Sequence, residues 1–211
     1  MADDSEARID QRAYIAARRE AMPVAISSNA EDIIRRLLFE RLPQLVGRLL
    51  ESDGESHDDI YFFNEHYVVK PPHSEVEFRW HRDDDEQLAM CVHRDSISPY
   101  VSVWCALDDI SDENGPLRFV PLNSSLHGEN DPSELEKYAS APVLAQAGTA
   151  VLFFSNVWHC SSSNTSGRSR RAFYAQYSSE RITATAKDKA PLSFAIPCEH
   201  GRFGAASTND Q

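Results

Sequence analysis

The residues after about position 60 follow a pattern of period two, in which apolar and polar side chains alternate over short segments. Turn residues interrupt these segments roughly every ten positions, a spacing typical of antiparallel sandwiches and barrels. Eight strands are what a double-sheet jelly roll needs, so the pattern predicts a mainly β fold of that type, a double-stranded β-helix. The expected strands are 60–70, 76–82, 100–107, 117–121, 142–145, 149–154, 171–178 and 192–196.

Two further features organise the chain around these strands. The dipeptide Asn114-Gly115 is a turn signal, so we expect 100–107 and 117–121 to be joined through it as a hairpin. Before position 52, apolar residues recur at helical spacing, and Pro43 should break or kink this stretch into two helices. We therefore expect one domain over 1–211, with a helical segment at 1–52, a jelly-roll core at 60–198 and a loose tail at 199–211.

The charge balance and the cysteines exclude several classes of protein. A net charge of −12 disfavours binding to a phosphate backbone. The sequence contains no run of about 18 apolar residues, and its N-terminus is acidic where a signal peptide would be basic and then apolar. The four cysteines lack a C-x-x-C motif, so we expect reduced thiols rather than a zinc site. These features predict a cytoplasmic protein without a nucleic-acid or membrane partner, and they leave the oligomeric state open.

A histidine and an aspartate two positions apart lie on one face of a strand, where both can contact a metal ion. This spacing occurs three times, more often than the composition predicts by chance, so the context of each pair must decide. The first pair lies in a polar, acidic loop, where solvation explains every residue. The second ends a predicted strand with an apolar opposite face, and the third remains the alternative. In chain order the pairs are His57/Asp59, His81/Asp83 and His93/Asp95.

A third ligand has to come from elsewhere in the fold, and His159 is the candidate. It follows an apolar strand, where a histidine is more often a core residue, but the polar loop after it brings Arg168, Arg170 and Arg171 back beside it. Two imidazoles and one carboxylate with open positions suit Fe(II) that activates O2. A guanidinium nearby would hold a dicarboxylate through two parallel hydrogen bonds, which implies a 2-oxo acid co-substrate.

Four stretches of the chain, in this order, resemble the phytanoyl-CoA dioxygenase-like branch of the Fe(II)/2-oxoglutarate oxygenases. The resemblance runs from about position 67 to 177. The stretches are KPP at 70–72 with WHRD at 80–83, VSVWCALDD at 101–109, ENGPLRFVP at 113–121, and 159–172 with Asn164, Ser166 and Arg170.

The resemblance implies a role for each matching residue. His81, Asp83 and His159 would be the iron ligands, and Arg170 would bind the far carboxylate of 2-oxoglutarate. Further matches are Trp104 and Ser161, which would line the co-substrate pocket, and Lys70, which would lie near the site entrance.

The chain departs from the family pattern at two places, both on the family's substrate side. Arg82 stands where the family usually has glutamine. The family's Pro-Gly-Ser-His segment becomes PLNSSLH at 121–127, which displaces the histidine to His127.

The resemblance implies an Fe(II)- and 2-oxoglutarate-dependent dioxygenase that uses O2 to hydroxylate an unknown small molecule and releases succinate and CO2. Because Asp83 retains the ligand carboxylate, we expect hydroxylation or desaturation rather than halogenation. One alternative is a cupin-like metal enzyme without a co-substrate, and Arg170 argues against it. The other is a non-catalytic binding module, and the complete triad argues against that.

Overall fold

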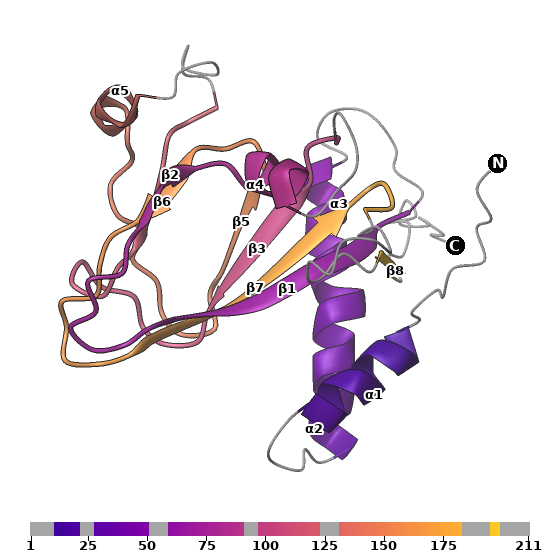
Figure 1. Ribbon diagram of the computed structural model, residues 1–211. Coiled ribbons are helices and arrows are strands. Elements are labelled where there is room, and N and C mark those ends of the chain that lie inside the picture. The colour runs from indigo at the N-terminus through magenta and orange to yellow at the C-terminus, as the bar shows by residue number, and fades with distance from the viewer. Residues whose placement is uncertain are drawn as a thin grey trace, which may run out of the picture.

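The computed structural model describes residues 11–21, 28–50, 59–90, 97–122, 131–182 and 195–198. Its strands form two antiparallel sheets, which lie as two layers in Figure 1. The larger sheet has the strand order β5-β3-β7-β1-β8, and the smaller has the order β2-β6-β4. The strands are β1 (Tyr61–Lys70), β2 (Phe78–His81), β3 (Val101–Ala106), β4 (Leu117–Phe119), β5 (Ala150–Phe154), β6 (His159–Ser161), β7 (Arg170–Ser178) and β8 (Ile196–Pro197).

Consecutive strands from β1 to β7 alternate between the two sheets. This alternation confirms the predicted mainly β jelly-roll fold. It also makes the predicted hairpin wrong, because β3 belongs to the larger sheet and β4 to the smaller one. The Asn114-Gly115 turn is present, with Gly115 at a φ of 82°, but the chain leaving it crosses to the opposite layer. A local turn signal therefore marked the turn correctly without identifying the partner strand.

Helices cover the outer face of the larger sheet. They are α1 (Gln11–Ala21), α2 (Ser28–Arg36), the π-helical turn η1 (Leu37–Arg41) and α3 (Leu42–Leu50). The interruption expected at Pro43 takes the form of η1, in which the Leu42 N–H donates to the Leu37 carbonyl five residues back. A widened turn of this kind suits a proline just beyond it, because proline has no N–H to donate.

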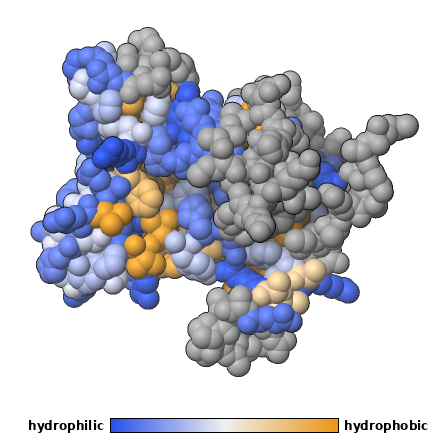
Figure 2. Space-filling view, viewed as in Figure 1, coloured by the Kyte–Doolittle hydropathy of each residue, from blue (hydrophilic) through white to orange (hydrophobic). Residues whose placement is uncertain are grey.

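The helices and the sheet share one aromatic core. Tyr14, Phe39 and Phe62 pack edge to face, with ring centroids 5.3–5.7 Å apart. The Tyr177 hydroxyl at the centre of the sheet donates to the Leu38 carbonyl at 2.8 Å. This packing buries the outer face of β7, while its inner face turns toward the smaller sheet. Strand β7 is consequently buried almost throughout. On the face drawn in Figure 2, the coloured surface is mostly hydrophilic, and apolar side chains gather at the left of the view.

Several predicted segments differ in detail from the observed elements. In the segment 142–145, only Val143 and Ala145 form isolated bridges, so it is not a strand. Of 192–196, only the last two residues are described, and Ile196 begins β8. The tail 199–211 lies outside the described residues, and the single-domain organisation stays a prediction.

Three further elements were not among the expected ones, and two of them carry a local signal that the period-two pattern hides. Helix α4 (Asp83–Met90) has four acidic residues in its first turn, which favours a helix N-terminus. Helix α5 (Pro132–Lys137) has Asp131 as its N-cap, accepting from the Ser133 N–H at 2.9 Å, with a proline in its first turn. Strand β6 has only three residues, which is too short to show a period.

Two predicted absences can be compared with the described part of the chain. Cys105, Cys160 and Cys198 are free thiols there, and Cys91 lies outside it. Among the described residues, no helix combines the length and the apolar character needed to cross a membrane.

Candidate functional site

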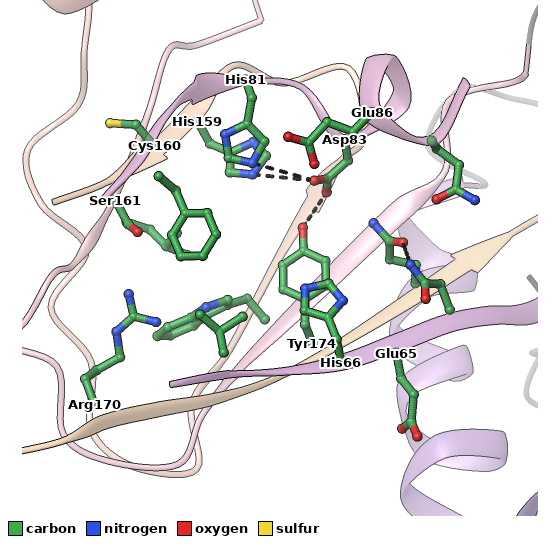
Figure 3. Close-up of a pocket in the computed structure, with 17 residues that line it drawn as sticks. Glu65, His66, His81, Asp83, Glu86, His159, Cys160, Ser161, Arg170 and Tyr174 are labelled. Atoms are coloured by element: carbon green, nitrogen blue, oxygen red, sulfur yellow. Dashed lines mark hydrogen bonds and ion pairs between the residues drawn. The ribbon is translucent and has the colours of Figure 1, made fainter. Parts of the chain in front are cut away.

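The smaller sheet brings the two predicted histidine ligands together. His81 is the last residue of β2 and His159 the first of β6, and they are direct partners in the antiparallel register. Their ring centroids are 4.1 Å apart. Asp83 does not share the strand face with His81, as the spacing predicted, because the chain leaves β2 and Asp83 opens α4 instead. The turn between them still directs the carboxylate at both imidazoles (Figure 3).

Backbone carbonyls determine which ring nitrogen of each histidine is free. Nδ1 of His81 lies 2.7 Å from the Arg79 carbonyl oxygen, and Nδ1 of His159 lies 3.0 Å from that of Val157. Since a carbonyl only accepts, each Nδ1 carries the proton and each Nε2 keeps its lone pair. Burial lowers the pKa of His159 to about 4, so this ring is neutral at neutral pH.

The two free nitrogens converge on one carboxylate oxygen. Asp83 Oδ1 lies 4.0 Å from His81 Nε2 and 3.7 Å from His159 Nε2. The potential ligand atoms of the three residues all lie within 4.8 Å of one another. Asp83 and His159 are buried, and His81 is partly exposed. Two imidazoles and a carboxylate in this arrangement are a donor set that fits Fe(II) with open positions.

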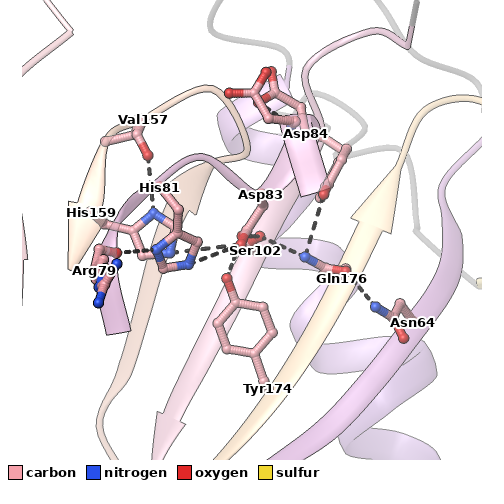
Figure 4. A network of polar contacts seen from close by, with 12 residues as sticks. Asn64, Arg79, His81, Asp83, Asp84, Ser102, Val157, His159, Tyr174 and Gln176 are labelled. Atoms are coloured by element: carbon pink, nitrogen blue, oxygen red, sulfur yellow. Dashed lines mark hydrogen bonds and ion pairs between the residues drawn. The ribbon is translucent and has the colours of Figure 1, made fainter. Parts of the chain in front are cut away.

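The other carboxylate oxygen, Asp83 Oδ2, is held from the larger sheet (Figure 4). It accepts hydrogen bonds from the Ser102 hydroxyl at 2.5 Å and from the Tyr174 hydroxyl. Gln176 Nε2 donates to the Ser102 oxygen at 3.3 Å, and Asn64 Nδ2 donates to Gln176 Oε1 at 2.8 Å. Every donor in this series points toward Asp83. The network therefore leaves Oδ1 as the oxygen that faces the histidines.

A cavity of about 340 Å³ opens between the two sheets beside these residues (Figure 3). Side chains from both sheets and from α4 line it. The lining residues are Asn64, Glu65, His66, Val68, Phe78, His81, Asp83, Glu86, Gln87, Trp104, Leu117, His159, Cys160, Ser161, Arg170, Tyr174 and Gln176.

Arg170 lines one end of the cavity and is 1% exposed. Its Nη2 donates to the Gly115 carbonyl at 2.7 Å, and its guanidinium lies 5.4 Å from the centre of the Trp104 ring. Its Nη1 is buried without a hydrogen-bond partner, and Arg170 takes part in none of the ion pairs among the described residues. Burial lowers the pKa of Arg170 to about 10, so it stays charged at neutral pH. A buried cation with a free donor is suited to binding an anion.

Lys70 lies behind this end of the cavity rather than at the site entrance. It is completely buried, sits opposite Arg170 in the β1–β7 register, and does not line the cavity. Its Nζ donates to the Ser161 hydroxyl at 2.8 Å and to the Ser161 carbonyl at 3.1 Å. Burial, followed by repulsion from Arg170, lowers the pKa of Lys70 to about 8. Ser161 and Trp104, by contrast, lie on the cavity wall as expected.

The remaining sequence candidates lie elsewhere. Arg82, expected on the substrate side, binds Asp85 at 2.7 Å and lies over the Trp158 ring, outside the cavity lining. Arg171 is exposed and pairs with Asp108 at 2.7 Å. Asp59, from the first alternative pair, is exposed. The remaining residues of the two alternative pairs and the displaced histidine lie outside the described residues; they are His57, His93, Asp95 and His127.

Sequence reasoning missed the residues that hold Asp83 from the opposite sheet. The missed residues are Ser102 on β3, two positions before the predicted Trp104, and Tyr174 and Gln176 on β7. Their spacing of two places each pair on one strand face. Polar side chains on the inward face of a predicted buried strand could therefore have indicated these residues.

Comparisons with known proteins agree with this geometry. The chain matches the family described as "Phytanoyl-CoA dioxygenase (PhyH)" over residues 2–172. It is 26% identical over 186 residues to L-proline trans-4-hydroxylase of Streptomyces griseoviridis. That match covers 74% of this chain and 65% of the relative, so the chain spans slightly less than two thirds of the relative's length.

Solved structures share the fold at low identity. AviO1 from Streptomyces viridochromogenes superposes with a TM-score of 0.53 at 23% identity, covering 79% of this chain and 64% of that one. EctD from S. alaskensis with bound Fe superposes with a TM-score of 0.50 at 23% identity, covering 77% and 64%. Because the family match spans most of the sequence, this chain belongs to the phytanoyl-CoA dioxygenase (PhyH) family.

Proposed function

We propose that this chain is an Fe(II)- and 2-oxoglutarate-dependent dioxygenase that hydroxylates a small molecule. The observation that carries the proposal is the presence, in one cavity, of a two-histidine, one-carboxylate cluster and a buried guanidinium with a free donor. Family membership supports it, as does a relative named for hydroxylating L-proline. A small-molecule substrate and a cytoplasmic location remain predictions.

The metal would be held by three atoms whose orientation is already determined. His81 and His159 would each contribute Nε2, because their Nδ1 atoms face backbone carbonyls. Asp83 would contribute Oδ1, because its Oδ2 is occupied by two hydroxyl donors. When bound there, Fe(II) supplies the redox chemistry that activates O2, which amino-acid side chains lack.

The co-substrate would be held at the Arg170 end. The free Nη1 of Arg170 is available for the far carboxylate of 2-oxoglutarate, and Nη2 keeps the guanidinium in place through Gly115. The Ser161 oxygen already accepts from Lys70, so the Ser161 proton is free to be donated to the same carboxylate. Trp104 would pack under the Arg170 guanidinium.

These residues would bind and orient the metal ion and the co-substrate. The atoms of the overall reaction balance as follows. One oxygen atom of O2 goes into succinate and the other into the substrate C–H bond, while CO2 leaves the 2-oxo acid. The apolar walls formed by Val68, Phe78 and Leu117 reduce the access of water to the reacting groups. A cupin-like enzyme without a co-substrate would have no use for the buried Arg170.

Anaerobic titration with Fe(II) and 2-oxoglutarate tests this proposal. We expect a visible charge-transfer band that requires both additions, and the release of succinate and CO2 once O2 is admitted. The matched control is Arg171→Ala, because Arg171 adjoins Arg170 but pairs with Asp108 on the surface. A protein that binds the metal but gives no band with 2-oxoglutarate would favour the cupin-like alternative.

A further inference from the structure

We propose that the substrate carries a cationic nitrogen, such as an ammonium group, and that Glu86 binds this nitrogen at the mouth of the cavity. The inference rests on the function proposed above and names the substrate class of the same site. It concerns the part of the cavity that Arg170 does not reach.

The cavity has two chemically different ends on either side of the triad. In Figure 3, Arg170 lies at one end, and Glu86 on α4 lies beside Asp83 near the other. Figure 4 shows Gln176 and Asn64 on the side of Asp83 away from the histidines. With His66 on β1, these side chains form the wall that remains once Arg170 has taken up a dicarboxylate. A substrate seated between this wall and the triad would contact Glu86.

Glu86 is the negative charge available to a substrate at this end. Glu65 also borders the cavity, but its side chain points toward the helices in Figure 3 and forms an ion pair with Arg18. The Glu86 carboxylate, within the part of the chain that the structure describes, forms neither an ion pair nor a hydrogen bond. Among the described lining residues, Arg170 is the only lysine or arginine. This wall therefore contains no lysine or arginine that could neutralise Glu86.

The other side chains of this wall are neutral groups that can form hydrogen bonds. Burial lowers the pKa of His66, so its imidazole is uncharged at neutral pH, and its ring stacks on Tyr174 with the centroids 4.7 Å apart. Asn64 and Gln176 are amides that bond to each other at 2.8 Å. This wall adds polarity without adding positive charge.

The cost of covering a carboxylate decides between substrate classes. A neutral substrate over Glu86 would remove water from the charge without replacing its hydrogen bonds, and an anionic one would add repulsion. An ammonium group would instead form a charge-assisted hydrogen bond to it. The net charge of −12 acts in the same direction at long range, attracting cations and repelling polyanions such as coenzyme A thioesters. A cavity of about 340 Å³ that also holds the co-substrate suits a small amine.

Three probes of equal ring size test the inference: cyclohexylamine, cyclohexanol and cyclohexanecarboxylate. Their binding would be measured by ligand-observed NMR on protein loaded with Zn(II) and 2-oxoglutarate, which cannot turn over. We expect the amine to bind at least about fivefold tighter than the carboxylate, as a charge-assisted contact at an open mouth should provide. Equal binding of the amine and the carboxylate would overturn the inference.

Two variants of Glu86 and one control locate the effect. Glu86→Gln should lose most of the preference for the amine while leaving cyclohexanol binding unchanged, and Glu86→Lys should reverse the preference. Neither substitution breaks an ion pair or a hydrogen bond, because the Glu86 carboxylate forms none with the described residues. Glu113→Gln removes the same charge from an exposed position outside the cavity and should change nothing. If Glu113→Gln weakened amine binding as much as Glu86→Gln, the long-range charge alone would explain the preference and the assignment to Glu86 would be wrong.

The test separates this inference from the proposed function. The same titrations on metal-free protein report the cation preference without any iron or co-substrate chemistry. In a protein that forms no Fe(II)·2-oxoglutarate complex, an amine preference that Glu86→Gln removes would contradict the proposed function and support the role of Glu86. A preference that Glu86→Gln leaves intact would belong to Asp83 and would overturn the inference. A normal Fe(II)·2-oxoglutarate complex in a protein without any amine preference would support the proposed function and contradict the role of Glu86.

Discussion

The Tyr174 hydroxyl on β7 donates a hydrogen bond to Asp83 Oδ2, the carboxylate oxygen turned away from His81 and His159. The bond runs from the larger sheet to the first residue of α4, which follows β2 of the smaller sheet (Figure 4). Burial, followed by the Asp83 charge, raises the pKa of Tyr174, which keeps the phenol protonated as a donor. Asp83 is therefore positioned by hydroxyl groups that belong to the larger sheet, whereas the two histidines belong to the smaller one.

Tyr174→Phe should weaken metal binding. Removing one of two donors to Oδ2 frees the carboxylate to rotate, and losing such a supporting hydrogen bond typically reduces metal affinity about 10- to 100-fold. Competition titration with Mn(II) measures the change. Tyr177→Phe on the same strand is the matched control, because the Tyr177 hydroxyl donates to Leu38 on the other face of the sheet. Equal loss in both variants would indicate general destabilisation instead.

His81→Ala and His159→Ala should each abolish metal binding and turnover. Each removes one of three ligands from a site that already leaves positions open. Equilibrium dialysis with Fe(II) under anaerobic conditions is the measurement. His57→Ala and His93→Ala should retain the metal. Metal binding that survives in His81→Ala but is lost in His93→Ala would show that His93 and Asp95 are the ligands instead.

Arg170→Lys should weaken 2-oxoglutarate binding by tens-fold or more and change metal affinity little. Lysine keeps the charge but loses the planar fork, and a buried charge pair that loses a partner costs about 2–5 kcal/mol. The co-substrate dependence of the charge-transfer band gives the affinity. Arg171→Lys is the control on the surface. An unchanged affinity in Arg170→Lys would mean that another residue holds the carboxylate.

The affinity for 2-oxoglutarate should fall as the pH rises through about 8. Burial lowers the pKa of Lys70 to about 8, so its positive charge behind Ser161 is present below that pH and is lost above it. An anionic co-substrate is attracted only by the charged form. Titrations between pH 7 and pH 9 test this, and the pH dependence should flatten in Lys70→Met. A dependence of the same shape in that variant would assign the titration to another group.

The product should be hydroxylated or desaturated and never chlorinated, even in high chloride. Asp83 occupies the position that chloride would need, and Ser102 and Tyr174 hold it there. Turnover under ¹⁸O2 with mass spectrometry should show one succinate per 2-oxoglutarate and labelled oxygen in a hydroxylated product. A chlorinated product, or conversion without succinate, would refute the role given to Asp83.

Some elements of the fold could be predicted because their signal is local. Strands β1 and β7 form where 60–70 and 171–178 were expected. Their burial does not alternate residue by residue, and β7 is buried almost throughout because both of its faces are covered. The partner of β3 could not be predicted in the same way. The Asn114-Gly115 signal is equally compatible with a hairpin and with a crossing to the other sheet, and only long-range packing selects the crossing.

The candidate site also has some features that local sequence signals predict and others that depend on long-range packing. His81, Asp83, His159 and Arg170 could be selected from short motifs and from the family resemblance that these motifs carry. The motifs could not show that Asp83 begins a helix, that Lys70 is buried behind the cavity, or which hydroxyls from the larger sheet hold the carboxylate. The physical reason is that periodicity encodes which side of a local element is buried, whereas contacts between layers depend on how elements distant in the chain pack together.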